Sequence, residues 1–305
     1  MHPRIWLALG LAAIGWGTSG PVTRAALAAG IPPVGMTAMR AAIAVVVITT
    51  IVYATDRRYP TDRPSWTLGA MMGTVNLALP FVATVIALQY ASSGFVGLLI
   101  ALTPLATALL AHYLLPDEPL QRAKITGLGV AFAGVGLLLV SGDSGLASGG
   151  RPLLAAALTV TAVIGISYGA IYAKQRQASF DPIVLTGMQF LVGVVLMVPM
   201  ALVVEGVPDV PSAWGVVLLL YLGVAGSVLP FLMFYWVLQR TSVTNASLVA
   251  YVVPLISLST GIVFLDERLD LGIAIGGALI LTGVLLIDRI ERGRSSVTVS
   301  AGPAH

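Results

Sequence analysis

The amino-acid sequence predicts an all-α polytopic membrane protein. It predicts ten transmembrane helices in two inverted five-helix repeats, with both termini in the cytoplasm (N-in/C-in). Three observations support this fold class. The chain of 305 residues is 57% hydrophobic and only 10% charged, whereas soluble domains are about a quarter charged. Apolar stretches of about 20 residues follow one another with short polar breaks between them. Finally, one long stretch of the first half returns in the second half.

The recurring stretch begins with Leu-Pro-Phe in both copies. It reads LPFVATVIALQYASSGFVGLLIALTP from Leu79 to Pro104 and LPFLMFYWVLQRTSVTNASLVAYVVP from Leu229 to Pro254. Without a gap, 8 of the 26 aligned residues are identical, where about 2 or 3 would match by chance. A duplicated membrane unit accounts for this match.

The first predicted repeat covers residues 5–140. Its opening apolar run also fits a signal peptide, but Gly15-Trp16-Gly17 has a counterpart near Ser167-Tyr168-Gly169. We therefore interpret the run as a retained helix. The other spans are apolar runs of helix length separated by polar turns. The five predicted spans are Ile5–Ser19, Pro33–Tyr53, Trp66–Leu88, Ser93–Leu115 and Ile125–Val140.

The second predicted repeat covers residues 153–288. A linker rich in Gly and Ser joins it to the first repeat at residues 141–152, and residues 289–305 form a cytoplasmic tail. Its spans are again apolar runs of helix length. They are Leu153–Ala173, Pro182–Val204, Ala213–Val237, Val243–Leu265 and Leu271–Ile287.

The predicted topology follows from the number of spans and from the basic residues. Because each half has an odd number of spans, the second half enters the membrane upside down, as in many secondary transporters. Cytoplasmic loops carry an excess of Lys and Arg. With the N-terminus inside, Arg24, Arg151 and Arg268 face outside and Arg40 lies within a span. The basic residues that face inside are Arg4, Arg57, Arg58, Arg63, Arg122, Lys124, Lys174, Arg176, Arg240, Arg289, Arg292 and Arg294.

Several of these features occur together in one known group. They are a Trp-Gly in the first span, a proline in the fourth and ninth spans, an acidic pair after each (Asp117-Glu118 and Asp266-Glu267), and a Gly-rich final helix in each half. In them the chain resembles the EamA-type proteins of the drug/metabolite transporter superfamily. The resemblance implies a carrier in the bacterial inner membrane that exports amino acids, other metabolites or drugs. It also implies a central cavity lined chiefly by spans 1–4 and 6–9.

Arg40 is the first candidate for substrate binding. It lies about seven residues inside the second span, roughly 10 Å from the outer boundary at about 1.5 Å per residue. A cation at that depth costs at least a few kcal/mol unless it meets the protein interior, water or a partner. Two interpretations stay open. Arg40 binds a substrate carboxylate or phosphate, or it snorkels outward or donates to carbonyls at a broken helix.

Uncharged polar and aromatic residues within the spans are further candidates. They can line a cavity with apolar walls and hydrogen-bonding tips, although interhelical hydrogen bonds and packing are the alternatives for each. These substrate-binding candidates are Trp16, Asn76, Phe81, Gln89, Tyr168, Gln189, Trp236 and Tyr251.

Four prolines at matching places in the two halves are candidates for gating. Pro80, Pro104, Pro230 and Pro254 each remove a backbone donor and clash with the preceding turn, so their helices should bend. Static kinks that shape the cavity are the alternative.

Other classes of protein are poorly supported. The serine string at Gly17-Thr18-Ser19-Gly20 suggests a membrane hydrolase, but a serine needs a nearby base. His112 is expected near the cytoplasmic end of the fourth span, whereas Ser19 is expected near the outer end of the first span. There is no P-loop, no cysteine, and no expected cofactor, metal or nucleic-acid partner. Gly272-x-x-x-Gly276 indicates close helix packing. We expect a monomer, with a homodimer as the alternative interpretation of this motif.

The sequence thus predicts a secondary transporter, not an enzyme, that exports amino acids or related carboxylates by alternating access. A broad-specificity drug exporter is the alternative within transport. Small multidrug exporters of the superfamily rely on a glutamate in the first span, and this chain has none there. A membrane sensor that does not transport is the alternative from another class, but the predicted tail is too short for a signalling domain.

Overall fold

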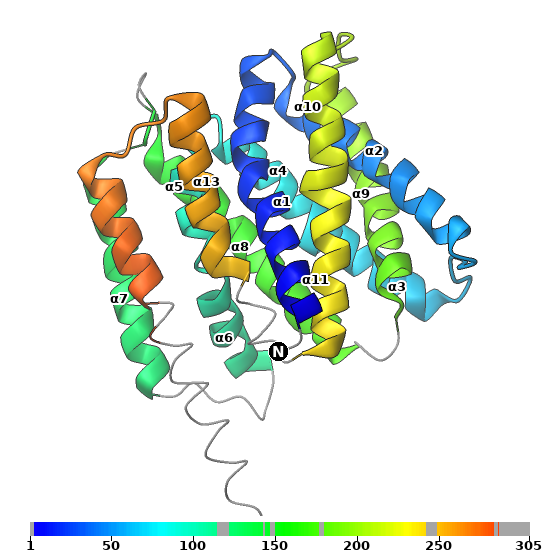
Figure 1. The fold of residues 1–305 in the computed structure, drawn as a ribbon, viewed down its shortest axis with the longest axis horizontal. Helices are drawn as coiled ribbons and strands as arrows, with labels where there is room; N and C mark the ends of the chain where they lie inside the picture. The colour runs from blue at the N-terminus through cyan, green and yellow to red at the C-terminus, as the bar shows by residue number, and fades with distance from the viewer. Residues whose placement is uncertain are drawn as a thin grey trace, which may run out of the picture.

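Every regular element in the described part of the chain is helical. The computed structural model describes residues 3–114, 122–142, 144–146, 150–176, 180–241, 249–283 and 286. Seven helices among them are long and apolar enough to cross a membrane, and three shorter apolar helices accompany them. The helices stand side by side and run between the two ends of a bundle (Figure 1). The chain is therefore a multi-pass helical membrane protein, as predicted.

The helices have the following bounds. The first half contains α1 (Pro3–Ala28), α2 (Pro33–Ala54), α3 (Arg63–Met71), the π-helix η1 (Met72–Ala78), α4 (Leu79–Ala87), α5 (Ser93–Ile100), α6 (Thr103–Leu114) and α7 (Arg122–Val140). The second half contains α8 (Pro152–Gln175), α9 (Pro182–Val204), α10 (Ala213–Gly223), the π-helix η3 (Val224–Val228), α11 (Leu229–Arg240), α13 (Val249–Leu265) and the helix Leu271–Gly283. The predicted start of the ninth span at Val243 and the end of the tenth at Ile287 lie outside the described residues.

The predicted end of the first span at Ser19 is wrong. Helix α1 continues through Pro21 and ends at Ala28. Pro21 removes one backbone donor, a loss that a helix surrounded by other helices tolerates. The helix ends where Gly30 adopts a φ of +83°, because glycine enters the left-handed region without strain and closes the last turn.

Different turns meet at the two ends of the bundle. At the upper end in Figure 1, the turn after α4 meets the segment before α8, because Ser92 N donates to Ser144 O at 2.8 Å. At the lower end, where α1 begins, Arg57 forms an ion pair with Asp181 at 2.9 Å. The two ends of the bundle keep these names, upper end and lower end, below.

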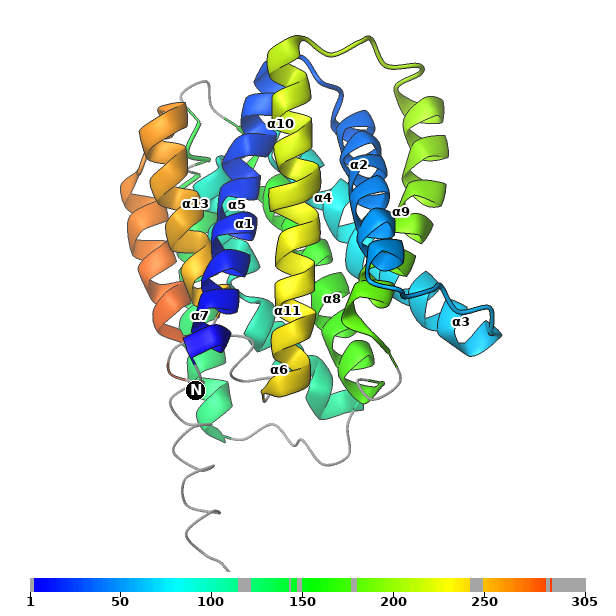
Figure 2. The same cartoon turned by 45° about the vertical axis from the view of Figure 1, so that its right-hand side comes forward.

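Helix α7 and the helix Leu271–Gly283 form a pair at one side of the bundle, while α2 and α9 stand at the opposite side (Figures 1 and 2). Glycines bring the first pair together. A Cβ atom on Gly134 would lie 2.6 Å from the carbonyl oxygen of Gly276, and a Cβ on Gly283 would lie 2.5 Å from that of Gly127. Only glycine permits this approach, which agrees with the predicted packing role of the Gly-x-x-x-Gly motif.

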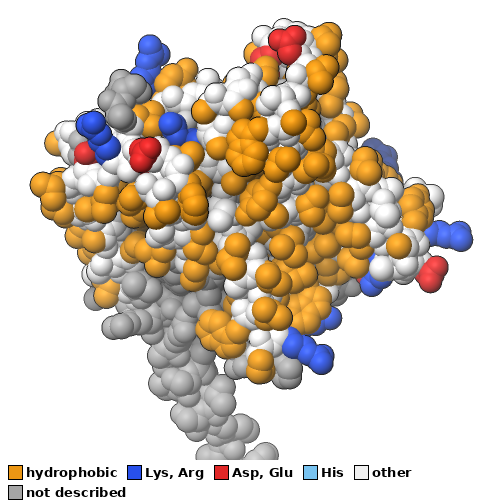
Figure 3. Space-filling view, turned by 45° about the horizontal axis from the view of Figure 1, so that its top comes forward, with side chains coloured by type: hydrophobic (Ala, Val, Ile, Leu, Met, Phe, Trp, Pro, Cys, Tyr) orange, Lys and Arg blue, Asp and Glu red, His pale blue; other side chains and the backbone are white. Residues whose placement is uncertain are grey.

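Hydrophobic side chains cover the wall of the bundle, whereas Lys, Arg, Asp and Glu gather toward its ends (Figure 3). Large apolar residues on this wall include Val46, Val195 and Phe264, which are 67%, 70% and 77% exposed. In water such exposure would be costly, so a lipid environment explains this surface.

Candidate functional site

A cavity of about 350 Å³ lies inside the bundle. Helices α1, α2, η1, α4, α5 and α6 of the first half line it together with α8, α11 and α13 of the second half. Thr23 and Ser93 line it near the upper end, and Ala111 and Lys174 line it near the lower end. The cavity therefore extends along the seam between the halves.

The sequence creates a helix irregularity on each side of this cavity. The π-helices η1 and η3 end directly before Leu79-Pro80 and Leu229-Pro230. In η3 the Leu229 N–H donates to Val224 O, five residues back, and an equivalent bond closes η1. Because proline lacks an N–H and clashes with the preceding turn, the wider π-turn accommodates it.

Arg40 reaches from α2 to the irregular turn of η3. Its Nε donates to Ser227 Oγ at 2.7 Å, and its Nη2 donates to Gly226 O at 2.6 Å. In a regular α-helix the amide of residue 230 would donate to this carbonyl, so Arg40 bonds an acceptor that Pro230 deprives of its usual donor. Arg40 also lines the cavity, and its Nη1 has no hydrogen-bond partner among the residues that the structure describes.

Aromatic rings form an apolar wall beside this cation. The Arg40 Cζ lies 4.2 Å from the ring centroid of Phe81, within the range of a cation–π contact. Trp16 packs edge-on against Phe231, with 5.5 Å between ring centroids, and lies equally close to Phe234. All of these residues line the cavity. A ligand with an apolar body and one anionic group fits such a wall.

A buried polar network joins the predicted residues Asn76 and Gln189. Tyr235 OH donates to Gln189 Oε1 at 2.9 Å and accepts from Asn76 Nδ2 at 3.4 Å. Asn76 and Tyr235 line the cavity, while Gln189 lies behind them and is fully buried. Gly169 makes room for Asn76, since a Cβ there would lie 2.5 Å from Asn76 Oδ1.

Several predicted residues lie elsewhere. Gln89 is exposed in the turn after α4. Tyr168 does not line the cavity but stacks on Tyr172, with 6.4 Å between ring centroids. Trp236 borders a shallow groove beside the start of α1. The side chain of Tyr251 lies outside the described residues.

The four prolines predicted to gate the cavity differ in their contact with it and in their helices. Pro80 and Pro104 line the cavity, whereas Pro230 and Pro254 do not. Pro104 follows a break between α5 and α6, where Thr103 Oγ1 donates to Ile100 O at 2.6 Å. Pro254 lies inside the continuous helix α13. Pro104 and Pro254 therefore differ in their backbone setting, whereas Pro80 and Pro230 each follow a π-helix.

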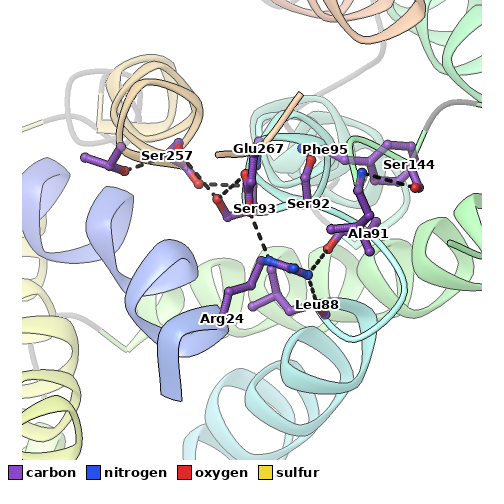
Figure 4. Close-up of polar contacts among 12 residues, drawn as sticks. Arg24, Leu88, Ala91, Ser92, Ser93, Phe95, Ser144, Ser257 and Glu267 are labelled. Carbon is purple, nitrogen blue, oxygen red and sulfur yellow. Dashed lines mark hydrogen bonds and ion pairs between the residues drawn. The ribbon is translucent and has the colours of Figure 1, made fainter. Parts of the chain in front are cut away.

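A buried charge cluster lies at the upper end (Figure 4) and was not predicted from the sequence, in which Arg24 and Glu267 are charges in loops or at span ends. In the structure the Glu267 side chain is only 3% exposed and its Oε1 lies 3.1 Å from Arg24 Nε. The signal available in the sequence was the recurrence of the acidic pair after the fourth and ninth spans.

The charged residues in the described part of the cavity lining are all basic. Among the described residues that line it, Arg40 and Lys174 are basic and none is Asp or Glu. Such a cavity favours anions over cations, because fields are strong where the surroundings have a low dielectric constant.

Two regions of the chain, residues 4–140 and 153–288, match the model of the EamA-like transporter family. The chain belongs to this family. The resemblance to EamA-type proteins is thereby confirmed. The family is a transporter family, not an enzyme class.

Similar proteins that are named as transporters agree with the assignment to this family. An uncharacterized transporter of Bacillus subtilis is 23% identical over 97% of this chain and 95% of its own length. A probable terminal-alkyne amino-acid exporter of Streptantibioticus cattleyicolor is 29% identical over 66% of each protein. A crystal structure of a protein 22% identical in sequence matches with a TM-score of 0.67, covering 96% of this chain and 99% of that one. This match shows a shared fold.

Proposed function

We propose that the protein is a secondary transporter that exports a small carboxylate with an apolar body by alternating access. An amino acid or a related metabolite is the substrate class that we favour. The ten spans form two inverted repeats in a bacterial inner membrane, with both termini in the cytoplasm. The observation that carries the proposal is Arg40, a cation in the wall of a central cavity whose described lining contains no acid.

Reciprocal contacts support the inverted repeat. A Cβ on Gly15 would collide with the Ala225 carbonyl, and a Cβ on Gly165 would collide with the Val75 carbonyl. Each of these residues lies 150 positions from its counterpart, so exchanging the halves turns the first contact into the second. Helix α1 begins at the lower end and α8 begins at the upper end (Figures 1 and 2). A two-fold axis in the membrane plane relates such halves.

The basic residues support the orientation. The upper end holds Arg24, Arg151 and Arg268. The lower end holds a larger group, as expected for the cytoplasmic side. Among the residues whose side chains the structure describes, this group comprises Arg4, Arg57, Arg58, Arg63, Lys174, Arg176 and Arg240.

Three properties of the cavity support an anionic, amphipathic substrate. Two of the Arg40 nitrogens are held by η3, which fixes the guanidinium without placing a carboxylate beside it. The unpartnered Nη1 can donate to a substrate carboxylate. The aromatic wall around Phe81 and Phe231 suits an apolar body. The relative named as a probable amino-acid exporter is consistent with this class. A cationic drug would have no acidic partner in the described lining.

The prolines supply points at which helices can bend. The π-turns before Pro80 and Pro230 depart from regular α-helical bonding, and the helix is interrupted before Pro104, between α5 and α6. Turns of this kind change shape at lower cost than a regular helix. We assign them, with Pro254, to the bending that opens the cavity to one side and then the other.

Counterflow in proteoliposomes tests the proposed function. Vesicles loaded with an unlabelled amino acid should accumulate the labelled one, and Arg40→Gln should reduce this exchange at least tenfold for carboxylates. The amide analogue of the same substrate should be affected much less, since it has no anionic group. Arg57→Gln, which removes a half-exposed ion pair at the lower end, is the control. If Arg40→Gln exchanged the acid as fast as the wild type does, and the amide likewise, the assigned role of Arg40 would be refuted.

A further inference from the structure

We infer that Arg24, Glu267, Ser93 and Gly94 form the gate that closes the cavity at the upper end (the upper gate). This inference rests on the alternating access of the proposed function. It assigns a role in the transport cycle to residues outside the wall that contacts the substrate.

Glu267 is the centre of the upper gate (Figure 4). It follows α13, but its carboxylate turns back onto the start of α5. Oε1 accepts from Ser93 N at 2.9 Å, and Oε2 accepts from Ser93 Oγ at 2.8 Å and from Gly94 N at 3.3 Å. The carboxylate thus binds the positive end of a helix, where amide hydrogens lack partners within the helix. A side chain at position 261 would collide with Glu267 Oε2, so Gly261 is required for this pose.

Arg24 adds α1 and the end of α4 to the same cluster. Its Nη1 donates to Leu88 O at 2.7 Å and to Ala91 O at 3.2 Å. Its Nε lies 3.1 Å from Glu267 Oε1, yet Nε has no properly directed hydrogen bond. The two charges therefore attract each other across a contact that lacks the directed bond of the strongest Arg–carboxylate pairs. Such a contact joins α1 to the segment after α13 but separates more readily than a bidentate pair.

The cluster adjoins the cavity at its upper end. Ser93 belongs both to the cluster and to the cavity lining, and Thr23, next to Arg24, lines the cavity as well. Ser257, another lining residue, donates from its hydroxyl to Ser93 O at 2.9 Å. Below these residues the cavity continues to Lys174 near the lower end. The cluster therefore lies between the cavity and the upper end, and the cavity extends from it toward the proposed cytoplasmic side.

Opening at the upper end requires these contacts to part. They join the upper ends of α1, α4 and α5 to the segment after α13, so no path into the cavity at this point opens while they hold. All the groups involved are polar, so water can satisfy each of them after separation. Polar contacts of this kind suit a gate, whereas an unpaired carboxylate left buried would be strongly unfavourable.

Accessibility of one introduced cysteine tests the gate without any substrate. The natural chain has no cysteine, so Thr23→Cys provides a single label site in the cavity below the gate. A membrane-impermeant maleimide is presented separately to each face of oriented vesicles. From the face of the upper end, Thr23→Cys should react slowly. Adding Glu267→Gln or Arg24→Gln should raise the rate at least tenfold, because either change removes the ion pair.

Glu205→Gln is the matched control. Glu205 is also a carboxylate at the upper end that accepts helix-start amides, from Val34 N at 2.9 Å and Gly35 N at 2.6 Å. It does not line the cavity, so adding Glu205→Gln to Thr23→Cys should leave the labelling rate unchanged. A rise as large as that of Glu267→Gln would overturn the inference, since it would indicate general loosening.

Two further results complete the test. Elution as a single species in detergent identifies the variants that fold, and either gate variant suffices if the other does not. Unchanged labelling in a folded gate variant would overturn the upper gate. If Arg40-dependent counterflow were still present, the proposed function would stand without this gate. Faster labelling without counterflow by the wild type would instead support the gate and refute the proposed substrate class.

Discussion

Ser227→Ala isolates the group that fixes the guanidinium of Arg40. The hydroxyl of Ser227 accepts from Arg40 Nε at 2.7 Å and donates to Leu222 O at 2.7 Å. The bond to the charged group is worth about 1.5–3 kcal/mol and the neutral bond about 0.5–1.5 kcal/mol. Because Ser227 is fully buried, water does not replace the hydroxyl. The variant should therefore lose about 2–4.5 kcal/mol of stability.

The functional consequence should be specific to carboxylates. With Nε unbound, the guanidinium loses one of its two fixed contacts and no longer presents Nη1 in a single orientation. We expect the half-saturation concentration in counterflow to rise about tenfold, equivalent to about 1.4 kcal/mol, for an amino acid but not for its amide. Thr50→Ala, which removes an outward-facing hydroxyl that bonds only Val46 O, is the control. An unchanged half-saturation concentration in folded Ser227→Ala would refute this account of how Arg40 is held.

Two further predictions concern packing and the polar network. Gly134→Leu should prevent stable folding, because its Cβ would lie 2.6 Å from a backbone oxygen of the neighbouring helix. Gly129→Leu, which has open space at its Cβ, should retain the wild-type melting temperature; equal behaviour of the two would contradict this reasoning. Gln189→Leu should change the free energy of unfolding by less than about 2 kcal/mol. It removes a buried Nε2 without a partner, which costs about 1–3 kcal/mol, but it leaves the buried Tyr235 hydroxyl without its acceptor, which costs a similar amount. A loss above about 3 kcal/mol would show that Nε2 has a partner.

The spans were predictable because hydrophobic length determines them. The run from Pro33 needs no tertiary information to be recognised as a helix, and the structure ends it within one residue of the prediction. Pro21 misled the prediction of α1, because a proline within a helix looks in sequence like a proline at its end. Its neighbours in the bundle decide between the two cases.

The orientation of side chains around each helix was not predictable. A helix that is apolar on all sides gives no periodic signal for its buried face. Tyr168 and Phe81 therefore looked equivalent as candidates, although only Phe81 lines the cavity. Glu267 was missed for a different reason. Its distance from Arg24 depends on how the segment after α13 returns over α5, and the sequence carries no local record of that path.

The central claim is that one cavity between the two halves opens to each side of the membrane in turn. Labelling of Thr103→Cys, in the cavity lining, tests it most directly. We predict that an impermeant maleimide reacts with this cysteine from both faces of oriented vesicles, and that a transported carboxylate slows both reactions. Alternating access would be contradicted if the cysteine reacted from one face only, both with and without substrate, and if adding Glu267→Gln did not change this.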